Sequence, residues 1–110
     1  MNDREMVELA AKAIRAKAWE PSFKGDHRKF TAEGFSGWFS PLEFKDHALS
    51  LAVQLRITIE PTDYDGKVNA YIGSGKVKLF YTSVSCPGDR MRSTMRVITS
   101  VAAQLGAVTP

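Results

Sequence analysis

Several ingredients that define other classes of protein are scarce in this 110-residue sequence. It has one cysteine, Cys86, so it can form neither an internal disulfide nor a cysteine-based zinc site. No apolar run approaches the roughly 18–20 residues that a membrane-spanning helix needs. Residues 1–20 carry acidic side chains and lack the apolar segment and cleavage site of a signal peptide, so we expect a mature cytoplasmic chain.

The composition that is present is typical of one globular domain spanning residues 1–110. Hydrophobic residues make up 44% and charged residues 25%, which is enough apolar material for a core. The net charge is +3. Basic side chains concentrate in residues 12–29 and 67–96, and acidic ones in residues 33–65. This segregation permits a basic face for an anionic partner but does not require one.

Two amphipathic helices are predicted near the ends of the chain. The first covers residues 2–18, with Asn2 as its N-cap and Glu5 completing a capping box. The second covers residues 89–105, with Gly106 as the residue that stops it. Their apolar stripes are Met6, Leu9, Ala10, Ala13 and Ile14 in the first helix, and Met91, Met95, Ile98, Ala102 and Leu105 in the second.

A third helix, over residues 41–54, has the clearest signals. Ser40 is a favourable N-cap, Pro41 falls at the first helical position, and Glu43 completes a second capping box. Its apolar residues recur at helical spacing, which predicts that this helix packs on the core. They are Phe44, Ala48, Leu51 and Leu55, with Leu49 and Ala52 beside them.

Three strands follow, over residues 55–61, 67–73 and 76–84, because apolar and polar residues alternate there. The connections are short and rich in turn residues, so we expect an antiparallel meander. In the last strand, alternation places Val77, Leu79 and Tyr81 on one face, with Phe80 and Thr82 opposite. A further short strand is predicted in "HRKFTA", residues 27–32.

The segment "GWFSPLEFKDHALSLAVQLRITI" resembles the signature of the phage ABA sandwich domain, a family of small phage and prophage proteins of uncharacterised role. The similar pattern is a Trp-x-x-Pro-Leu entrance followed by an apolar helix and a strand. Its residues here are Trp38, Pro41, Leu42, Ala48, Leu49, Leu51, Ala52, Val53 and Leu55. The closing "RSTMRVITSVAAQLG" is similar to the family's last helix. Arg56 stands where the family usually has glycine, so we expect a different helix-to-strand corner there.

The resemblance implies a sheet between two helix layers, without enzymatic activity or a cofactor. The strand pattern gives one apolar sheet face and one mostly polar face, which by itself favours two layers. We expect an α+β fold of order α-(β)-α-β-β-β-α. Its small antiparallel sheet has three or four strands with helices on its faces, an α/β/α sandwich whose second face is only partly covered.

No catalytic or metal-binding pattern is evident in the sequence. His27 and His47 are the only histidines. Asp46 adjoins His47, but neighbouring residues on a helix do not face each other, and His27 lies beside Asp26 in a predicted loop. Cys86 precedes a predicted helix start, which can lower the pKa of a thiol, but an ordinary thiol is the simpler interpretation. The "GSGK" at residues 73–76 lacks the full phosphate-loop pattern and predicts a hairpin turn. We expect no catalytic residue, metal or cofactor.

The most distinctive charged cluster is Arg90, Arg92 and Arg96, because cations are disfavoured in the first turn of a helix. An incoming anion would find both N–H groups and guanidiniums there, but a solvated surface neutralised by Asp89 and other acids is the simpler explanation. The preferred hypothesis, from the resemblance, is an accessory protein that binds another protein, in the host cytoplasm if phage-encoded. The alternative is a nucleic-acid-binding module that uses Lys12, Lys17, Lys76, Lys78, Arg90, Arg92 and Arg96.

Overall fold

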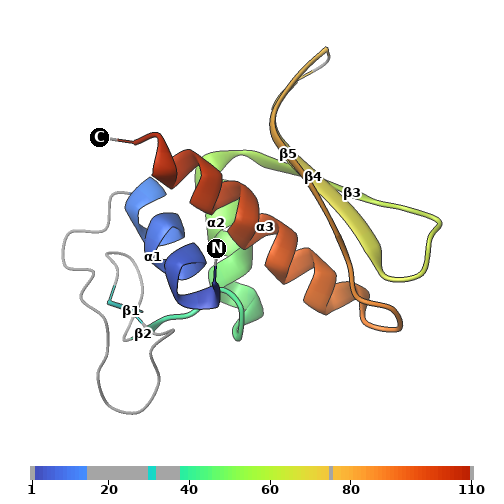
Figure 1. Cartoon of the computed structure of the whole chain (residues 1–110), viewed down its shortest axis with the longest axis horizontal. Coiled ribbons are helices and arrows are strands. Elements are labelled where there is room, and N and C mark those ends of the chain that lie inside the picture. The colour runs from blue at the N-terminus through green and yellow to red at the C-terminus, as the bar shows by residue number, and fades with distance from the viewer. Residues whose placement is uncertain (1, 15–29, 32–37, 75, 110) are drawn as a thin grey trace.

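The computed structural model describes residues 2–14, 30–31, 38–74 and 76–109. Three helices, α1 (Asp3–Ala13), α2 (Lys45–Leu55) and α3 (Arg90–Ala107), accompany a three-stranded antiparallel sheet (Figure 1). Its strands are β3 (Ile57–Pro61), β4 (Lys67–Ser74) and β5 (Val77–Ser85), in the order β3-β4-β5. The α+β class, the meander and the order α-α-β-β-β-α are confirmed.

The short strand predicted before α2 is present as β1 (Phe30–Thr31), and it has a partner that the alternation did not predict. It pairs antiparallel with β2 (Trp38–Phe39), in a two-stranded ladder separate from the main sheet. Among the described residues the main sheet therefore has three strands, the lower of the two expected numbers.

Helix α3 lies across one face of the sheet, and α1 and α2 pack against α3 (Figure 1). The core cluster joins apolar residues of the three helices to the apolar face of β3 and β4, including Ile57, Val68 and Ala70. In the described part of the chain no helix covers the opposite sheet face, so the layering is simpler than the expected sandwich. That face carries Thr58, Glu60 and Asn69, which gain less from burial than apolar side chains do.

The contact between α1 and α3 depends on a glycine whose role the sequence pattern misassigns. Gly106 does not stop α3 but lies inside it, buried against α1. A methyl group on Gly106 would overlap the carbonyl of Leu9, so the absence of a side chain lets the two backbones touch. α1 ends at Ala13, and residues 15–18 of the predicted helix lie outside the described part of the chain. Its predicted cap is confirmed: the Asn2 side chain accepts the Glu5 N–H at 2.8 Å.

Helix α2 begins four residues later than predicted. Residues 41–43 form a turn in which the Ser40 carbonyl accepts the N–H groups of Glu43 and Phe44, and Phe44 becomes the N-cap. The buried Ser40 hydroxyl has no hydrogen-bond partner among the described residues, so the predicted capping box is not formed. Instead, the Ser40 N–H donates to Nδ1 of His47 at 2.8 Å. His47 thus ties the entrance turn to the helix.

The corner between α2 and β3 has left-handed backbone geometry at Arg56. Arg56 adopts φ 55° and ψ 47°, and its backbone N–H donates to the carbonyl of Ala52. Arg56 therefore adopts a left-handed conformation that glycine takes more readily. A side chain in this region costs on the order of 1 kcal/mol, and the strand that must begin at Ile57 imposes that conformation.

A β-bulge in β5 changes which side chains face the core. Ala70 pairs with Thr82 but Ile72 pairs with Leu79, so Phe80 and Tyr81 together lie opposite Tyr71. Phe80 has φ 57° and packs against the core cluster, whereas Tyr81 stacks on Tyr71. The predicted apolar face of Val77, Leu79 and Tyr81 is wrong, because strict alternation does not continue through a bulge.

We expect Gly106→Ala to lower the free energy of unfolding by about 1–3 kcal/mol, because the new methyl group forces α1 and α3 apart. This reverses the usual gain of replacing glycine by alanine inside a helix. Urea denaturation followed by circular dichroism measures the effect. Ser100→Ala, on the same helix and only partly buried, is the control. Equal stability of Gly106→Ala and wild type would show that the helices do not approach this closely.

We expect stability to fall as the pH drops below about 6.5, because burial lowers the pKa of His47 and outweighs the opposing Asp46 charge. The unfolded chain takes up this proton near the ordinary histidine pKa, and the folded chain only at lower pH. The neutral ring also keeps Nδ1 available for the Ser40 N–H. Denaturation at pH 5 and pH 7.5 should show the loss in wild type and a smaller one in His47→Gln. Since both chains contain His27, an equal loss in both would exclude His47 as its source.

Candidate protein-docking groove

An apolar chamber lies between α2 and α3, above β3. Its volume is about 250 Å³, and its lining is mostly aliphatic and thioether. Leu49 and Met91 remain 61% and 49% exposed beside it, while Met95 and Ile98 are buried. The lining residues are Lys45, Asp46, Ala48, Leu49, Ile59, Met91, Thr94, Met95 and Ile98.

A second, more polar and more open chamber adjoins the first. Its volume is about 530 Å³, and it shares Lys45, Met91 and Met95 with the apolar chamber. Its other lining residues are Leu42, Glu43, Asp89 and Arg92. Because the two chambers share these three lining residues, we take them together as one candidate surface and call it the docking groove.

The docking groove exists because the apolar surface of α2 is wider than the part that neighbouring elements cover. Ala48, Leu51 and Ala52 face the core, but Leu49 and Val53, one turn apart, remain exposed. Phe44 and Met91, both predicted to be core residues, are also about half exposed. The sequence contained a signal for this groove, namely an apolar stripe wider than one packing face. Such a stripe leaves part of its apolar surface exposed.

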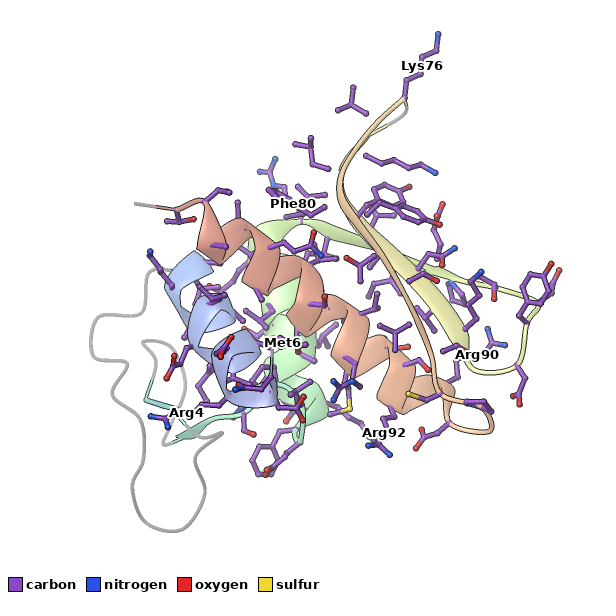
Figure 2. The ribbon with its side chains drawn as sticks, in the orientation of Figure 1. Arg4, Met6, Lys76, Phe80, Arg90 and Arg92 are labelled. Atoms are coloured by element: carbon purple, nitrogen blue, oxygen red, sulfur yellow. The ribbon has the colours of Figure 1, made fainter. Side chains whose placement is uncertain are left out.

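The basic residues singled out in the sequence do not gather on one surface. Lys76 lies at the tip of the β4–β5 hairpin, whereas Arg90 and Arg92 lie at the far end of the molecule, where α3 begins (Figure 2). Lys12 is on α1, and Lys17 lies outside the described residues. "GSGK" connects paired strands, as a hairpin turn should.

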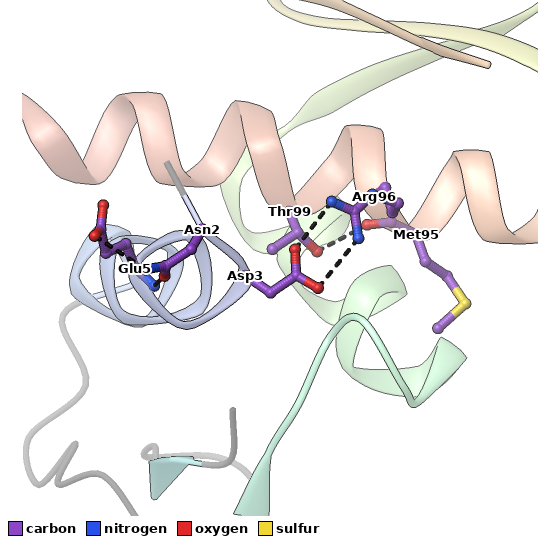
Figure 3. Close-up of polar contacts among 6 residues, drawn as sticks. All are labelled: Asn2, Asp3, Glu5, Met95, Arg96 and Thr99. Atoms are coloured by element: carbon purple, nitrogen blue, oxygen red, sulfur yellow. Dashed lines mark hydrogen bonds and ion pairs between the residues drawn. The ribbon is translucent and has the colours of Figure 1, made fainter. Parts of the chain in front are cut away.

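Arg96 joins α3 to α1. Its guanidinium contacts both carboxylate oxygens of Asp3, at 3.0 and 3.4 Å (Figure 3). This two-pronged geometry is among the stronger forms of ion pair. Asp3 also lies in the first turn of α1, where a carboxylate is favourable. The charge of Arg96 is thus engaged within the fold.

Two further cations are engaged locally. Arg90 donates to the carbonyls of Thr62 and Tyr64 and so holds the β3–β4 connection against the start of α3. Lys78 lies 4.0 Å from a Glu60 carboxylate oxygen, with its ammonium over the ring of Tyr71. Both contacts stabilise the protein's own structure, although Arg90 keeps its full charge beside neutral carbonyls and the Lys78 pair is exposed to solvent.

The described residues that were considered for catalysis make packing contacts or hydrogen bonds within the protein. His47 stacks on Phe39 and accepts the Ser40 N–H, and His27 lies outside the described residues. Cys86 is partly buried, and its backbone N–H donates to the Ser93 hydroxyl at 2.8 Å. Within the described ranges, no group of three or more potential ligands gathers as a metal site requires. Those ranges also contain no helix of the length and hydropathy needed to cross a bilayer.

Comparison of the chain with protein families, curated proteins and solved structures gives no match.

We expect Asp3 and Arg96 to show a coupling free energy of about 0.5–1 kcal/mol in a double-mutant cycle, discounted because both side chains are partly exposed. The cycle uses Asp3→Ala, Arg96→Ala and the double variant, each measured by denaturation. Arg92→Ala is the control, since its side chain has no ion-pair partner among the described residues. A coupling of zero would leave Arg96 available for an external ligand.

Proposed function

We propose that this chain is a non-enzymatic accessory protein of the phage or prophage type, and that it acts by binding another protein. The type is suggested by the resemblance of residues 38–59 to the phage ABA sandwich signature. The manner of action is supported by the docking groove, whose apolar chamber opens to solvent between α2 and α3.

The size and lining of the apolar chamber carry the proposal. Its volume is about 250 Å³. A cavity of this size suits one or two apolar side chains, such as the anchor residues that dominate protein interfaces. Leu49 and Met91 flank it with apolar surface that a partner would remove from water.

The chemistry of the lining also supports binding rather than catalysis. Ile59, Met91 and Ile98 supply aliphatic and thioether surface. Methionine adapts its shape to different partners because its side chain is unbranched and polarisable. Such a lining favours apolar contact.

The nucleic-acid alternative has weaker support. Arg90, Arg96 and Lys78 are engaged within the fold, and Lys76 lies far from the arginines. A phosphate backbone requires several cations along one surface. A gel shift that weakens steeply with salt would favour nucleic acid over protein as the partner.

We expect Leu49→Asp with Met91→Asp to abolish partner capture while leaving the fold intact, because both side chains are about half exposed. Immobilised wild type, the groove variant and Val108→Asp are compared in lysate of cells that naturally carry the gene. Val108 is 67% exposed and does not line the groove, so its variant is the matched control.

A genuine partner should be retained by wild type and by the control, and bound at least about tenfold less tightly by the groove variant, which corresponds to about 1.4 kcal/mol. Equal retention of every captured protein by all three chains would rule out the groove as the docking site.

A further inference from the structure

We infer that the Asp65–Gly66 bond is a site of spontaneous isomerisation to isoaspartate, and that the contact between two loops of the fold keeps this reaction slow. Neither residue lines the docking groove, so the inference does not depend on the proposed function. It assigns to the chain a chemical modification that requires water and no enzyme.

The chemistry follows from the dipeptide Asp-Gly, which occurs in this chain at residues 65–66 alone. The backbone nitrogen of Gly66 can attack the side-chain carboxyl carbon of Asp65, because glycine has no side chain to block the approach. A C–N bond forms, and the nitrogen's proton leaves with a carboxyl oxygen as water, which gives a cyclic succinimide. Water then opens this ring at either carbonyl. One opening restores Asp65, and the other leads the main chain through the former side chain.

Both oxygens of the Asp65 carboxylate are held by a neighbouring loop. The Gly88 N–H, in the connection between β5 and α3, donates to them at 3.1 and 3.2 Å. The Ser85 hydroxyl donates to the Asp65 carbonyl at 3.4 Å. The oxygen that is lost as water is one of the two that Gly88 holds, so the reaction must break a contact of the folded protein.

The glycine is held by the same pair of loops. Gly66 has φ 64°, and its carbonyl accepts the Cys86 N–H at 3.3 Å. A methyl group on Gly66 would overlap the carbonyl oxygen of Cys86, so the two loops touch through their backbones. Any shift of Gly66 toward the Asp65 side chain therefore disturbs the packing of the two loops.

Arg90 clamps the loop that contains this bond. Its guanidinium donates to the carbonyls of Thr62 and Tyr64 from the start of α3 (Figure 2). Local separation of the loops is thus the step that makes Asp65 reactive. The product cannot restore the contact, because isoaspartate lengthens the main chain by one carbon and leaves its carboxylate directly on the α-carbon.

The test compares the folded protein with a peptide of residues 58–70, in which the second loop is missing. Both are incubated at neutral pH and 37 °C for several weeks, and isoaspartate is located by mass spectrometry of the fragments. Asp63, which precedes the bulky Tyr64, is the internal control. We expect isoaspartate in the peptide mainly at Asp65, and its formation in the protein at least about tenfold more slowly, the factor that about 1.4 kcal/mol of loop opening provides.

Equal isomerisation of Asp63 and Asp65 in the peptide would overturn Asp65 as the preferred site. Equal rates at Asp65 in the peptide and in the protein would overturn the protection by the loops.

Arg90→Ala then tests the contact itself, because it removes the clamp without changing the reacting residues. Isoaspartate should form several-fold faster than in wild type, while Arg92→Ala, at an exposed position on the same helix, should match wild type. Circular dichroism verifies that both variants are folded. If Arg90→Ala does not fold, Ser85→Ala replaces it, since it removes the hydroxyl that binds the Asp65 carbonyl. An unchanged rate in the folded variant would refute the role of the loop contact.

Discussion

The fold depends on the close contact between α1 and α3 and on the two-sided burial of α3. On one side, Gly106 brings the backbone of α3 against the carbonyl of Leu9. On the other, α3 covers the apolar face of the sheet and meets α2. Small residues, including Ala102 and Ala103, make this central position possible, because they let neighbouring elements approach without voids. The ion pair between Asp3 and Arg96 then fixes how the two helices are aligned.

The docking groove is a by-product of how α2 enters this arrangement. Ser40 to Phe44 form a separate turn held by His47, so the helix itself starts at Lys45. That start places Lys45 and Leu49 on the first two turns, beside Met91 of α3. A charged residue and an apolar residue thus stand at the same opening.

Local signals in the sequence are sufficient to predict most of the helices and strands. Asn2 and Asp89 cap their helices as expected of their side chains, and period-two alternation locates all three strands of the sheet. The layering is harder to predict, because a polar sheet face can be covered or bare depending on the rest of the chain. Gly106 shows the limit of a local signal. A glycine near the end of a helix can either terminate that helix or allow a second helix to approach closely, and the local sequence is the same in both cases.

The candidate site was predictable only in part. Arg92 and Arg96 lie four residues apart and look equivalent in sequence, yet Arg96 meets Asp3, 93 positions away, and Arg92 remains unpaired among the described residues. Leu49 and Ala48 both belong to the apolar pattern of the helix, but only Ala48 faces the core. Both distinctions depend on which elements become neighbours, and short-range periodicity carries no information on that.

The bulge at Phe80 has a further consequence for how copies of this molecule meet at high concentration. β3 and β5 are the edge strands of the sheet among the described residues, and uncovered edges can pair with identical strands of other copies. β3 is only five residues long and ends in Pro61, which has no N–H to offer. β5 is longer, but the irregularity at Phe80 interrupts its row of backbone donors and acceptors midway. A second copy that approached either edge would therefore meet a short strand ending in proline at β3, or a row of donors and acceptors interrupted by the bulge at β5.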